Sequence, residues 1–161
     1  MSGRRRWVIA AAACLVVAGG FCLAEAMKNR SKDAQIATQA VSVRHFDQAA
    51  EDKYAWGTIH WLSNKALDSG AEQTFGIVEI KAGHQNALHM HPNCEELLYV
   101  LSGSCEHVVG DKKVILHAGD LLRVPRGAKH QATVIGDEPL RAVISYSCPN
   151  RQVINYGKSA E

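Results

Sequence analysis

The sequence GHQNALHMHPNCEELLYVLSG, residues 83–103, holds two histidines and a carboxylate within a short span. In a β-strand, side chains two positions apart face the same side, so His89 and His91 can direct both imidazoles at one point. Glu96 opens the apolar run that follows and shares its parity with Leu98. We therefore expect His89, His91 and Glu96 to converge inside a β-rich fold.

Glu95 is the competing carboxylate, because it stands directly before Glu96. Parity places Glu96, but not Glu95, on the face that carries Leu98 and Val100. We therefore choose Glu96 as the inward carboxylate. Glu95 is expected to point outward or toward a neighbouring subunit.

A third histidine, His130, follows a Pro-Arg-Gly turn at residues 125–127 and opens a later β-rich run. Three imidazoles and one carboxylate suit a divalent first-row metal and leave coordination positions for water or substrate. Inward side chains from several strands meet inside a small barrel. The predicted metal ligands are therefore His89, His91, Glu96 and His130.

Short β-rich runs separated by turn residues fill the chain from Trp56 onward. Many short strands with frequent turn signals are typical of an all-β sandwich or barrel. We predict a small antiparallel double-sheet β-barrel over residues 56–157, preceded by a linker or N-terminal arm at 27–55. The predicted strands are Gly57–Leu62, Thr74–Ile80, Glu95–Leu101, Glu106–Val109, Lys113–His117, Leu121–Val124, Ala132–Ile135, Leu140–Tyr146 and Gln152–Asn155.

The spacing of these residues resembles the two motifs of the cupin superfamily, over about residues 56–150. The first motif, G-x5-H-x-H-x3,4-E-x6-G, is met by Gly83, His89, His91, Glu96 and Gly103. The second, G-x5-P-x-G-x2-H-x3-N, is met by Gly119, Pro125, Gly127 and His130. Val134 replaces the final Asn, which is not a metal ligand in the family pattern. The resemblance implies a jelly-roll barrel that holds a metal.

Among small single-domain cupins, the resemblance implies a dioxygenase-like activity of the quercetinase type. It implies a divalent metal cofactor, iron or manganese first, with nickel or zinc as alternatives that would favour an isomerase or lyase. Glu96 is the expected catalytic residue, because the family carboxylate is proposed in some members to leave the metal and take a proton. The partner would be a small-molecule substrate. The alternative is a non-catalytic binding or sensing cupin with a structural metal, and turnover discriminates the two.

The N-terminal residues 1–26 have the pattern of a secretory signal peptide. Three arginines at positions 4–6 precede the uncharged, mostly apolar residues 7–24, and the small-residue site at 24–26 places cleavage before Met27. A membrane span needs about 20 apolar residues, and this run has 18. A cleaved signal is therefore favoured, and an uncleaved anchor is the alternative. We expect an exported protein, periplasmic or secreted, or one held at the membrane by this segment.

The net charge bears on the possible partners, and the cysteine content bears on the possible disulfides. The formal net charge is +2, and removal of the predicted signal brings it to zero. A nucleic-acid binder usually carries a strong, clustered basic excess, so no nucleic-acid partner is expected. Three cysteines would remain, Cys94, Cys105 and Cys148. They permit at most one internal disulfide, whose pairing the sequence leaves open.

Other polar and aromatic side chains allow two interpretations each. Arg123 can face the cavity and hold an anionic substrate, or make an outward salt bridge. The aromatic residues that can line a pocket, or instead fill the core or a dimer interface, are Trp56, Trp61, Tyr99 and Tyr146.

Three surface features complete the expectations. The polar residues 84–86 can line the barrel mouth, but we favour an exposed loop. His107 and His117 flank a predicted hairpin and are expected at the surface. A homodimer is also possible, because the run 56–62 could act as an edge strand, and unpaired edges invite pairing.

Overall fold

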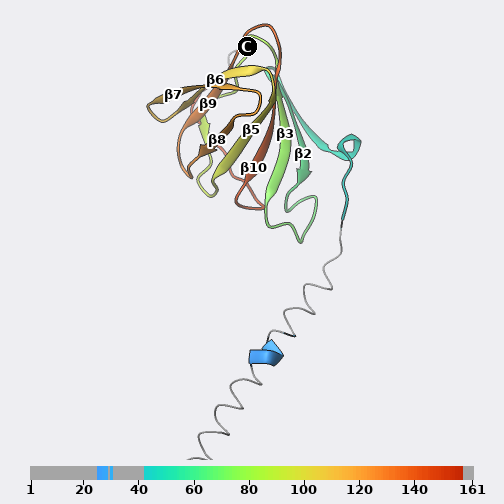
Figure 1. The fold of residues 1–161 in the computed structure, drawn as a ribbon. Coiled ribbons are helices and arrows are strands. Elements are labelled where there is room, and N and C mark those ends of the chain that lie inside the picture. Colours follow the sequence, from blue (N-terminus) through green and yellow to red (C-terminus); the bar gives the residue numbers. More distant parts are fainter. Residues whose placement is uncertain (1–24, 29, 31–41, 158–161) are drawn as a thin grey trace, which may run out of the picture. The chain divides into compact units, whose positions relative to one another are not determined.

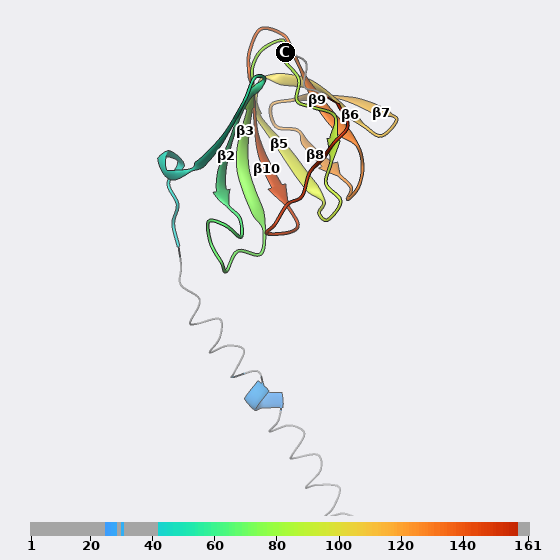
Figure 2. The same cartoon turned by 180° about the vertical axis from the view of Figure 1, so that it is seen from behind.

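Two antiparallel β-sheets face each other in the computed structural model, which describes residues 25–28, 30 and 42–157 (Figure 1). One sheet has six strands in the order β1-β2-β3-β10-β5-β8, and the other has five in the order β11-β4-β9-β6-β7. Figure 2 shows the same arrangement from behind. The elements are a 3-10 turn η1 (Phe46–Gln48) and the strands β1 (Ala50–Tyr54), β2 (Gly57–Ser63), β3 (Thr74–Ile80), β4 (His89–Met90), β5 (Glu96–Ser102), β6 (Ser104–Val109), β7 (Lys112–His117), β8 (Leu121–Val124), β9 (His130–Ile135), β10 (Leu140–Tyr146) and β11 (Ile154–Asn155).

The hydrophobic core lies between the sheets, and strand parity decides which residues reach it. On β5, Glu96, Leu98 and Val100 are buried while the intervening side chains are exposed. The neighbouring strand β10 buries alternate residues from Leu140 to Tyr146. The prediction of an all-β, antiparallel double sheet is confirmed, and so is the choice of Glu96 as the inward carboxylate.

Each of the nine predicted runs overlaps a strand, and the structure adds β1 and β4. Strand β1 lies inside the interval 27–55 that the sequence suggested as a linker or arm. It pairs with β2, which pairs on its other side with β3. The interpretation of residues 56–62 as a free edge was therefore wrong, because β1 and β8 form the edges of this sheet.

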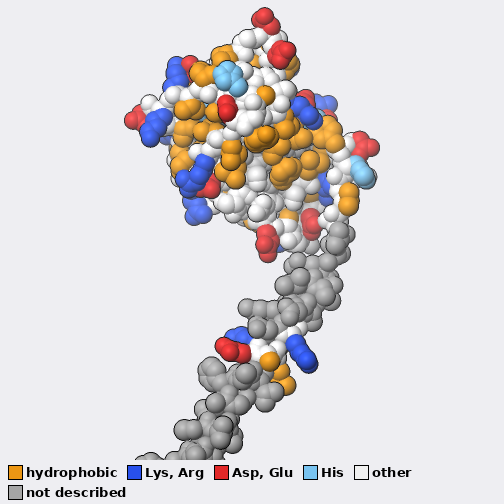
Figure 3. All heavy atoms as spheres, in the orientation of Figure 1, with side chains coloured by type: hydrophobic (Ala, Val, Ile, Leu, Met, Phe, Trp, Pro, Cys, Tyr) orange, Lys and Arg blue, Asp and Glu red, His pale blue; other side chains and the backbone are white. Residues whose placement is uncertain are grey.

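The outer face of the six-stranded sheet carries many apolar side chains. Figure 3 shows hydrophobic side chains gathered over the sheet that faces the viewer in Figure 1. Leu97, Tyr99 and Leu101 alternate with the buried residues of β5, and Leu121 lies opposite Tyr99 on β8. These four side chains, all exposed, are called the outer patch below.

A disulfide joins Cys94, just before β5, to Cys148, just after β10. Among the cysteines that the structure describes, Cys105 is the free thiol, and it is buried on β6. The structure thus resolves the pairing that the three cysteines left open. The bond attaches the segment that follows β10 to the strand that begins with Glu96.

Gly103 shows why the first cupin motif ends in glycine. It turns the chain between β5 and β6 with a φ of +75°, in the left-handed region that disfavours side chains. A Cβ at this position would lie 2.4 Å from the carbonyl oxygen of Pro139. Both the backbone conformation and the close approach therefore require glycine.

The predicted signal or anchor falls almost entirely outside the described residues. Of residues 1–26, the structure describes only 25 and 26, which are helical together with 27, 28 and 30. Among the described residues, no helix is both long enough and apolar enough to cross a membrane.

Candidate metal centre

The four predicted ligands meet at one point between the two sheets. One nitrogen from each imidazole and one oxygen of Glu96 all lie within 4.8 Å of one another. The Glu96 Oε2 atom is 3.1 Å from His91 Nε2 and 3.0 Å from His130 Nε2. His91, Glu96 and His130 are buried, and His89 is half-buried. The sequence prediction that these four side chains converge is thus met in the structure.

Strand pairing explains the convergence. His89 on β4 lies directly opposite His130 on β9 in an antiparallel pair. His91 follows two positions after His89, just beyond the end of β4. Glu96 approaches from the other sheet, at the first position of β5. Three ligands therefore come from one sheet region and the fourth from the opposite sheet.

Each imidazole is oriented by a backbone carbonyl. The Nδ1 atoms donate to the carbonyl oxygens of Ala87, Gln152 and Ala128, for His89, His91 and His130 respectively, at 2.8, 2.8 and 3.0 Å. A hydrogen on Nδ1 leaves the Nε2 lone pair free to coordinate a metal. Such a second hydrogen bond is the usual way in which proteins fix the tautomer and ring direction of a metal-binding histidine.

Burial and mutual contacts shift the pKa values of these side chains. Burial opposes ionisation of Glu96, but the adjacent imidazoles of His130 and His91 outweigh it and hold the pKa of the carboxyl well below its usual range. Burial, followed by the charge of His130, lowers the pKa of His89 to about 3. Burial also acts to lower the pKa of His130, yet the hydrogen bond to Glu96 raises it overall. Without a metal, His130 thus carries a proton more readily than His89.

The donor set fits a divalent metal ion. His91 Nε2 is buried and makes no hydrogen bond of good geometry, although it faces Glu96. A buried polar atom without a partner is costly, and coordination of a metal would satisfy it. Three neutral imidazoles and a carboxylate are the ligand types that iron, manganese, nickel and zinc accept. His89, His91, Glu96 and His130 could therefore hold a metal ion, and they are called the metal-binding group below.

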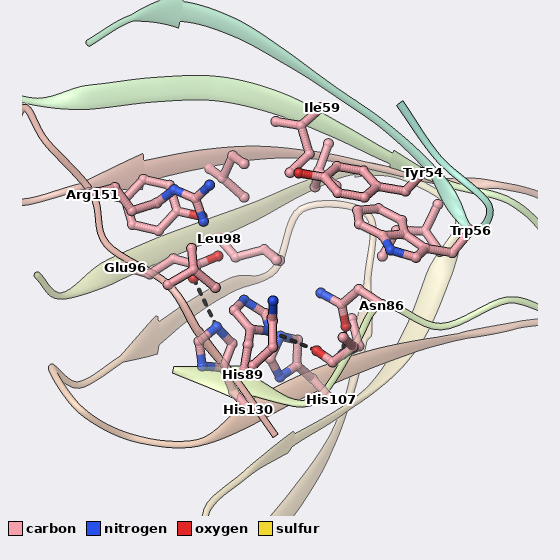
Figure 4. A pocket seen from close by; sticks show the side chains of 18 of the residues that line it. Tyr54, Trp56, Ile59, Asn86, His89, Glu96, Leu98, His107, His130 and Arg151 are labelled. Atoms are coloured by element: carbon pink, nitrogen blue, oxygen red, sulfur yellow. Dashed lines mark hydrogen bonds and ion pairs between the residues drawn. The ribbon is translucent and has the colours of Figure 1, made fainter. Parts of the chain in front are cut away.

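A cavity of about 530 Å³ opens beside this group (Figure 4). Glu96 is the one carboxylate among its lining residues, and most of the remaining wall is apolar or aromatic. Pockets of this size accept small organic molecules. The apolar part of the wall consists of Ala55, Trp56, Ile59, Val78, Ile80, Ala87, Leu98, Ala132, Ile144 and Val153.

The expected surface position of His107 was wrong. His107 is 1% exposed and lines the cavity, where its ring stacks on His130 with the centroids 5.8 Å apart. Burial lowers its pKa to about 4. Its parity with buried Cys105 on β6 is the sequence signal that could have placed it inward. His117, by contrast, is exposed as expected.

The structure also shows which of the other candidate residues line the cavity. Trp56, Tyr146 and Asn86 line the cavity, so the exposed-loop interpretation of Asn86 was wrong. Trp61 is a core residue, and Tyr99 is exposed on the outer face.

Arg123 does not face the cavity. Its side chain is largely exposed and pairs with Glu95, which points outward as expected. The cationic side chain that lines the cavity is instead Arg151, which follows β10. No periodic pattern around residue 151 could have indicated this position.

Tyr146 connects the metal-binding group to Arg151. Its ring packs edge-on against His91 with the centroids 4.8 Å apart. Burial and the nearby charge of Glu96 raise the pKa of the Tyr146 hydroxyl well above its ordinary value, so this group stays protonated. The hydroxyl interacts with both the Glu96 carboxylate and the Arg151 guanidinium.

Comparison with known proteins finds a cupin domain in this chain. Residues 76–146 match the family model described as a cupin domain. Protein SchB of Streptomyces halstedii is 25% identical over 105 residues, which cover 65% of this chain and 76% of that protein. Together with the two sheets and the ligand group, the match shows a cupin domain at residues 76–146.

Solved structures with the same fold include two oxalate decarboxylases. The enzyme of Lactobacillus farciminis, in a formate complex, is 27% identical with a TM-score of 0.64, and the match covers 69% of this chain and 34% of that one. The Bacillus subtilis enzyme, studied for its Mn(II) centres, is 22% identical with a TM-score of 0.63, over 68% of this chain and 30% of that one. The chain thus spans about a third of these enzymes.

Proposed function

We propose that this protein is an exported metalloenzyme, a metal-binding cupin that acts on a small organic molecule in a dioxygenase-like reaction. The observation that carries the proposal is the ligand group itself. Three imidazoles, each fixed by a carbonyl at Nδ1, direct their other nitrogens toward one carboxylate at the wall of a cavity of about 530 Å³. This arrangement leaves room for a substrate beside the ligands.

The proposed cofactor is a divalent iron or manganese ion held by His89, His91, Glu96 and His130. The manganese centres of the Bacillus subtilis relative in fold support the choice of a divalent ion. Such an ion supplies Lewis acidity to a substrate oxygen and a centre for electron transfer. Nickel or zinc would instead support an isomerase or lyase reaction.

Glu96 is the proposed catalytic residue. It is the one carboxylate among the residues that line the cavity, so a proton released from a substrate hydroxyl there would pass to its free oxygen. The neighbouring Tyr146 hydroxyl, which interacts with Glu96, can accompany that proton movement. The apolar walls exclude water and strengthen the electrostatic interactions inside the cavity.

Export is supported by two features. The N-terminal residues 1–26 have the composition of a secretory signal, and the Cys94–Cys148 disulfide suits an oxidising compartment. Fractionation of cells that express the full chain, followed by intact mass measurement, tests this part. A cytoplasmic protein that retains residues 1–26 would contradict it.

Metal analysis of the full chain, purified without a tag or chelator, tests the proposed function. We expect close to one iron or manganese per chain, and loss of that metal in the His89→Ala/His130→Ala variant. His117→Ala, an exposed histidine on β7, is the matched control and should keep its metal. Oxygen consumption with phenolic and small-acid substrates then tests turnover. A metal-loaded protein that consumes neither oxygen nor substrate would contradict the enzyme and leave a ligand-binding cupin.

A further inference from the structure

Arg151 presents a positive charge to the metal-binding cavity from a position outside both cupin motifs. It lies in the segment between β10 and β11 and lines the cavity together with Glu96 and Tyr146. In Figure 4 its guanidinium lies at the cavity wall near Glu96 and Leu98. It therefore lies where a molecule in the cavity could reach it.

Two aromatic rings hold the guanidinium in place. Its central carbon is 4.7 Å from the centre of the Trp61 ring and 5.1 Å from that of Tyr146. Trp61 is itself fixed, because its indole Nε1 donates to Asp52 Oδ2 at 2.8 Å. A planar guanidinium between rings loses little further freedom when it binds a ligand, so Arg151 is preorganised.

No carboxylate among the described residues forms an ion pair with this guanidinium. The ion pairs among the described residues involve Lys53, Lys113, Arg123, Arg141 and three histidines, but not Arg151. A partly desolvated cation without a counter-ion is unfavourable, and an anion that enters the cavity would compensate it. Carboxylates suit a guanidinium particularly well, because they accept two parallel hydrogen bonds from it.

The rest of the cavity limits the shape of that anion. The walls supplied by Ile59, Val78, Leu98 and Ile144 offer no hydrogen bonds and favour an apolar body. A cavity of about 530 Å³ would be mostly empty around a bare small acid. The geometry thus favours a molecule with one charged end and an apolar, ring-sized hydrocarbon part, for which two fused rings serve as a probe.

We propose that Arg151 forms an anion subsite and that the cavity takes a carboxylate carried on an apolar, ring-sized body. This inference rests on the proposed function insofar as the ligand lies beside the metal-binding group. Arg151 is then a specificity-determining residue, because it selects the charged molecule over a neutral one of the same shape. It differs from the proposed metal ligands in that it acts with or without the metal.

Calorimetric titration of the full chain with 2-naphthoate, and with neutral 2-naphthamide, tests the subsite. Both probes are titrated into metal-loaded and metal-free protein, because a carboxylate could also bind the metal directly. Loss of a charge-assisted bidentate contact costs about tenfold or more in affinity. We expect Arg151→Gln to weaken 2-naphthoate about tenfold or more in both forms of the protein and to change 2-naphthamide less than about twofold.

Two further variants make the result specific. Arg151→Lys keeps the charge but not the planar fork, so it should keep part of the preference for the anion. Lys112→Gln removes a charge of the same sign from the exposed first residue of β7 and should leave both affinities unchanged. Circular dichroism of each variant establishes that the fold is intact.

The outcomes separate this inference from the proposed enzyme. Equal affinities of the wild type and Arg151→Gln for 2-naphthoate, with the fold intact, would overturn the subsite even if metal and oxygen consumption were found. If Arg151→Gln weakened 2-naphthoate binding in the metal-loaded protein alone, the subsite would also be overturned, since the carboxylate would then bind the metal. Anion binding that depends on Arg151, without any turnover, would support the subsite and contradict the enzyme.

Discussion

At the scale of single residues, backbone carbonyls both near and far in the sequence orient the histidines of the metal-binding group. The carbonyls of Ala87 and Ala128 accept from the histidines two positions after them, so the local chain orients His89 and His130. The carbonyl that orients His91 belongs to Gln152, 61 positions away. The segment after β10 therefore completes the group, although the cupin motifs end before it.

The buried imidazole of His107 should make the metal-free protein sensitive to acid. Its pKa is about 4 in the folded protein and 6.5 in the unfolded chain, so between these values the unfolded chain binds the extra proton. This proton uptake is negligible well above pH 6.5, and it lowers the free energy of unfolding as the pH falls toward 4. We expect His107→Gln to remove about 2.5 kcal/mol of the stability lost between pH 7 and 4.5.

Urea unfolding of chelator-treated wild type and His107→Gln at pH 7 and 4.5 measures this difference. His117→Gln is the control, because that imidazole is exposed on β7 and should leave the pH dependence close to that of the wild type. Identical losses in the wild type and His107→Gln would show that His107 does not carry the effect.

The site residues that the sequence predicted differ physically from the one that it missed. His89, His91, Glu96 and His130 follow from spacing, because strand parity fixes on which side a side chain lies. Arg151 reaches the cavity from an irregular segment, where no period relates position to direction. Its role depends on the packing of Trp61 and Tyr146 beneath it, which only the folded structure brings together.

At the scale of secondary structure, apolar alternation decided which strands the sequence could predict. Strands β3, β8 and β10 begin and end as predicted, since each carries apolar residues. Strand β1 consists of Ala50-Glu-Asp-Lys-Tyr54 and is almost wholly exposed, so it shows no such pattern. Strand β4 has two residues, and pairing with its neighbours defines it rather than its own sequence.

The disulfide should stabilise the fold and the metal site together. It closes a loop of 54 positions, and such a crosslink typically contributes about 2–4 kcal/mol by restricting the unfolded chain. It also anchors the segment that carries Gln152, whose carbonyl orients His91. We expect Cys94→Ala/Cys148→Ala to lower the free energy of unfolding by this amount and to weaken Mn²⁺ binding.

Urea unfolding with and without a phosphine reductant, together with Mn²⁺ titration, checks both effects. The reductant should shift the wild type toward the double variant and leave the double variant unchanged, which serves as the internal control. A wild type whose unfolding midpoint ignores the reductant, under conditions in which free-thiol counting shows that the bond is reduced, would contradict the stabilising role.

At the scale of the whole barrel unit, the outer patch is an apolar surface that neither the core nor the metal-binding group uses. Leu97, Tyr99, Leu101 and Leu121 are each between 38% and 61% exposed, on two adjacent strands. Contiguous apolar surface of several hundred Å² marks an interaction site in soluble proteins. Because a twofold axis places the same patch on both sides of an interface, a second copy of the chain is a complementary partner.

We therefore expect a homodimer through the outer patch, with twice the mass of a single chain. Tyr99→Lys/Leu121→Asp should dissociate it, because burial of charges in an apolar interface is costly. Tyr99 and Leu121 lie opposite each other, so the two new charges attract and preserve the pairing of β5 with β8. Ile115→Lys, an equally apolar and exposed position on β7, should leave the dimer intact. Light scattering after gel filtration distinguishes the species, and a wild type that is monomeric at tens of micromolar would contradict the expectation.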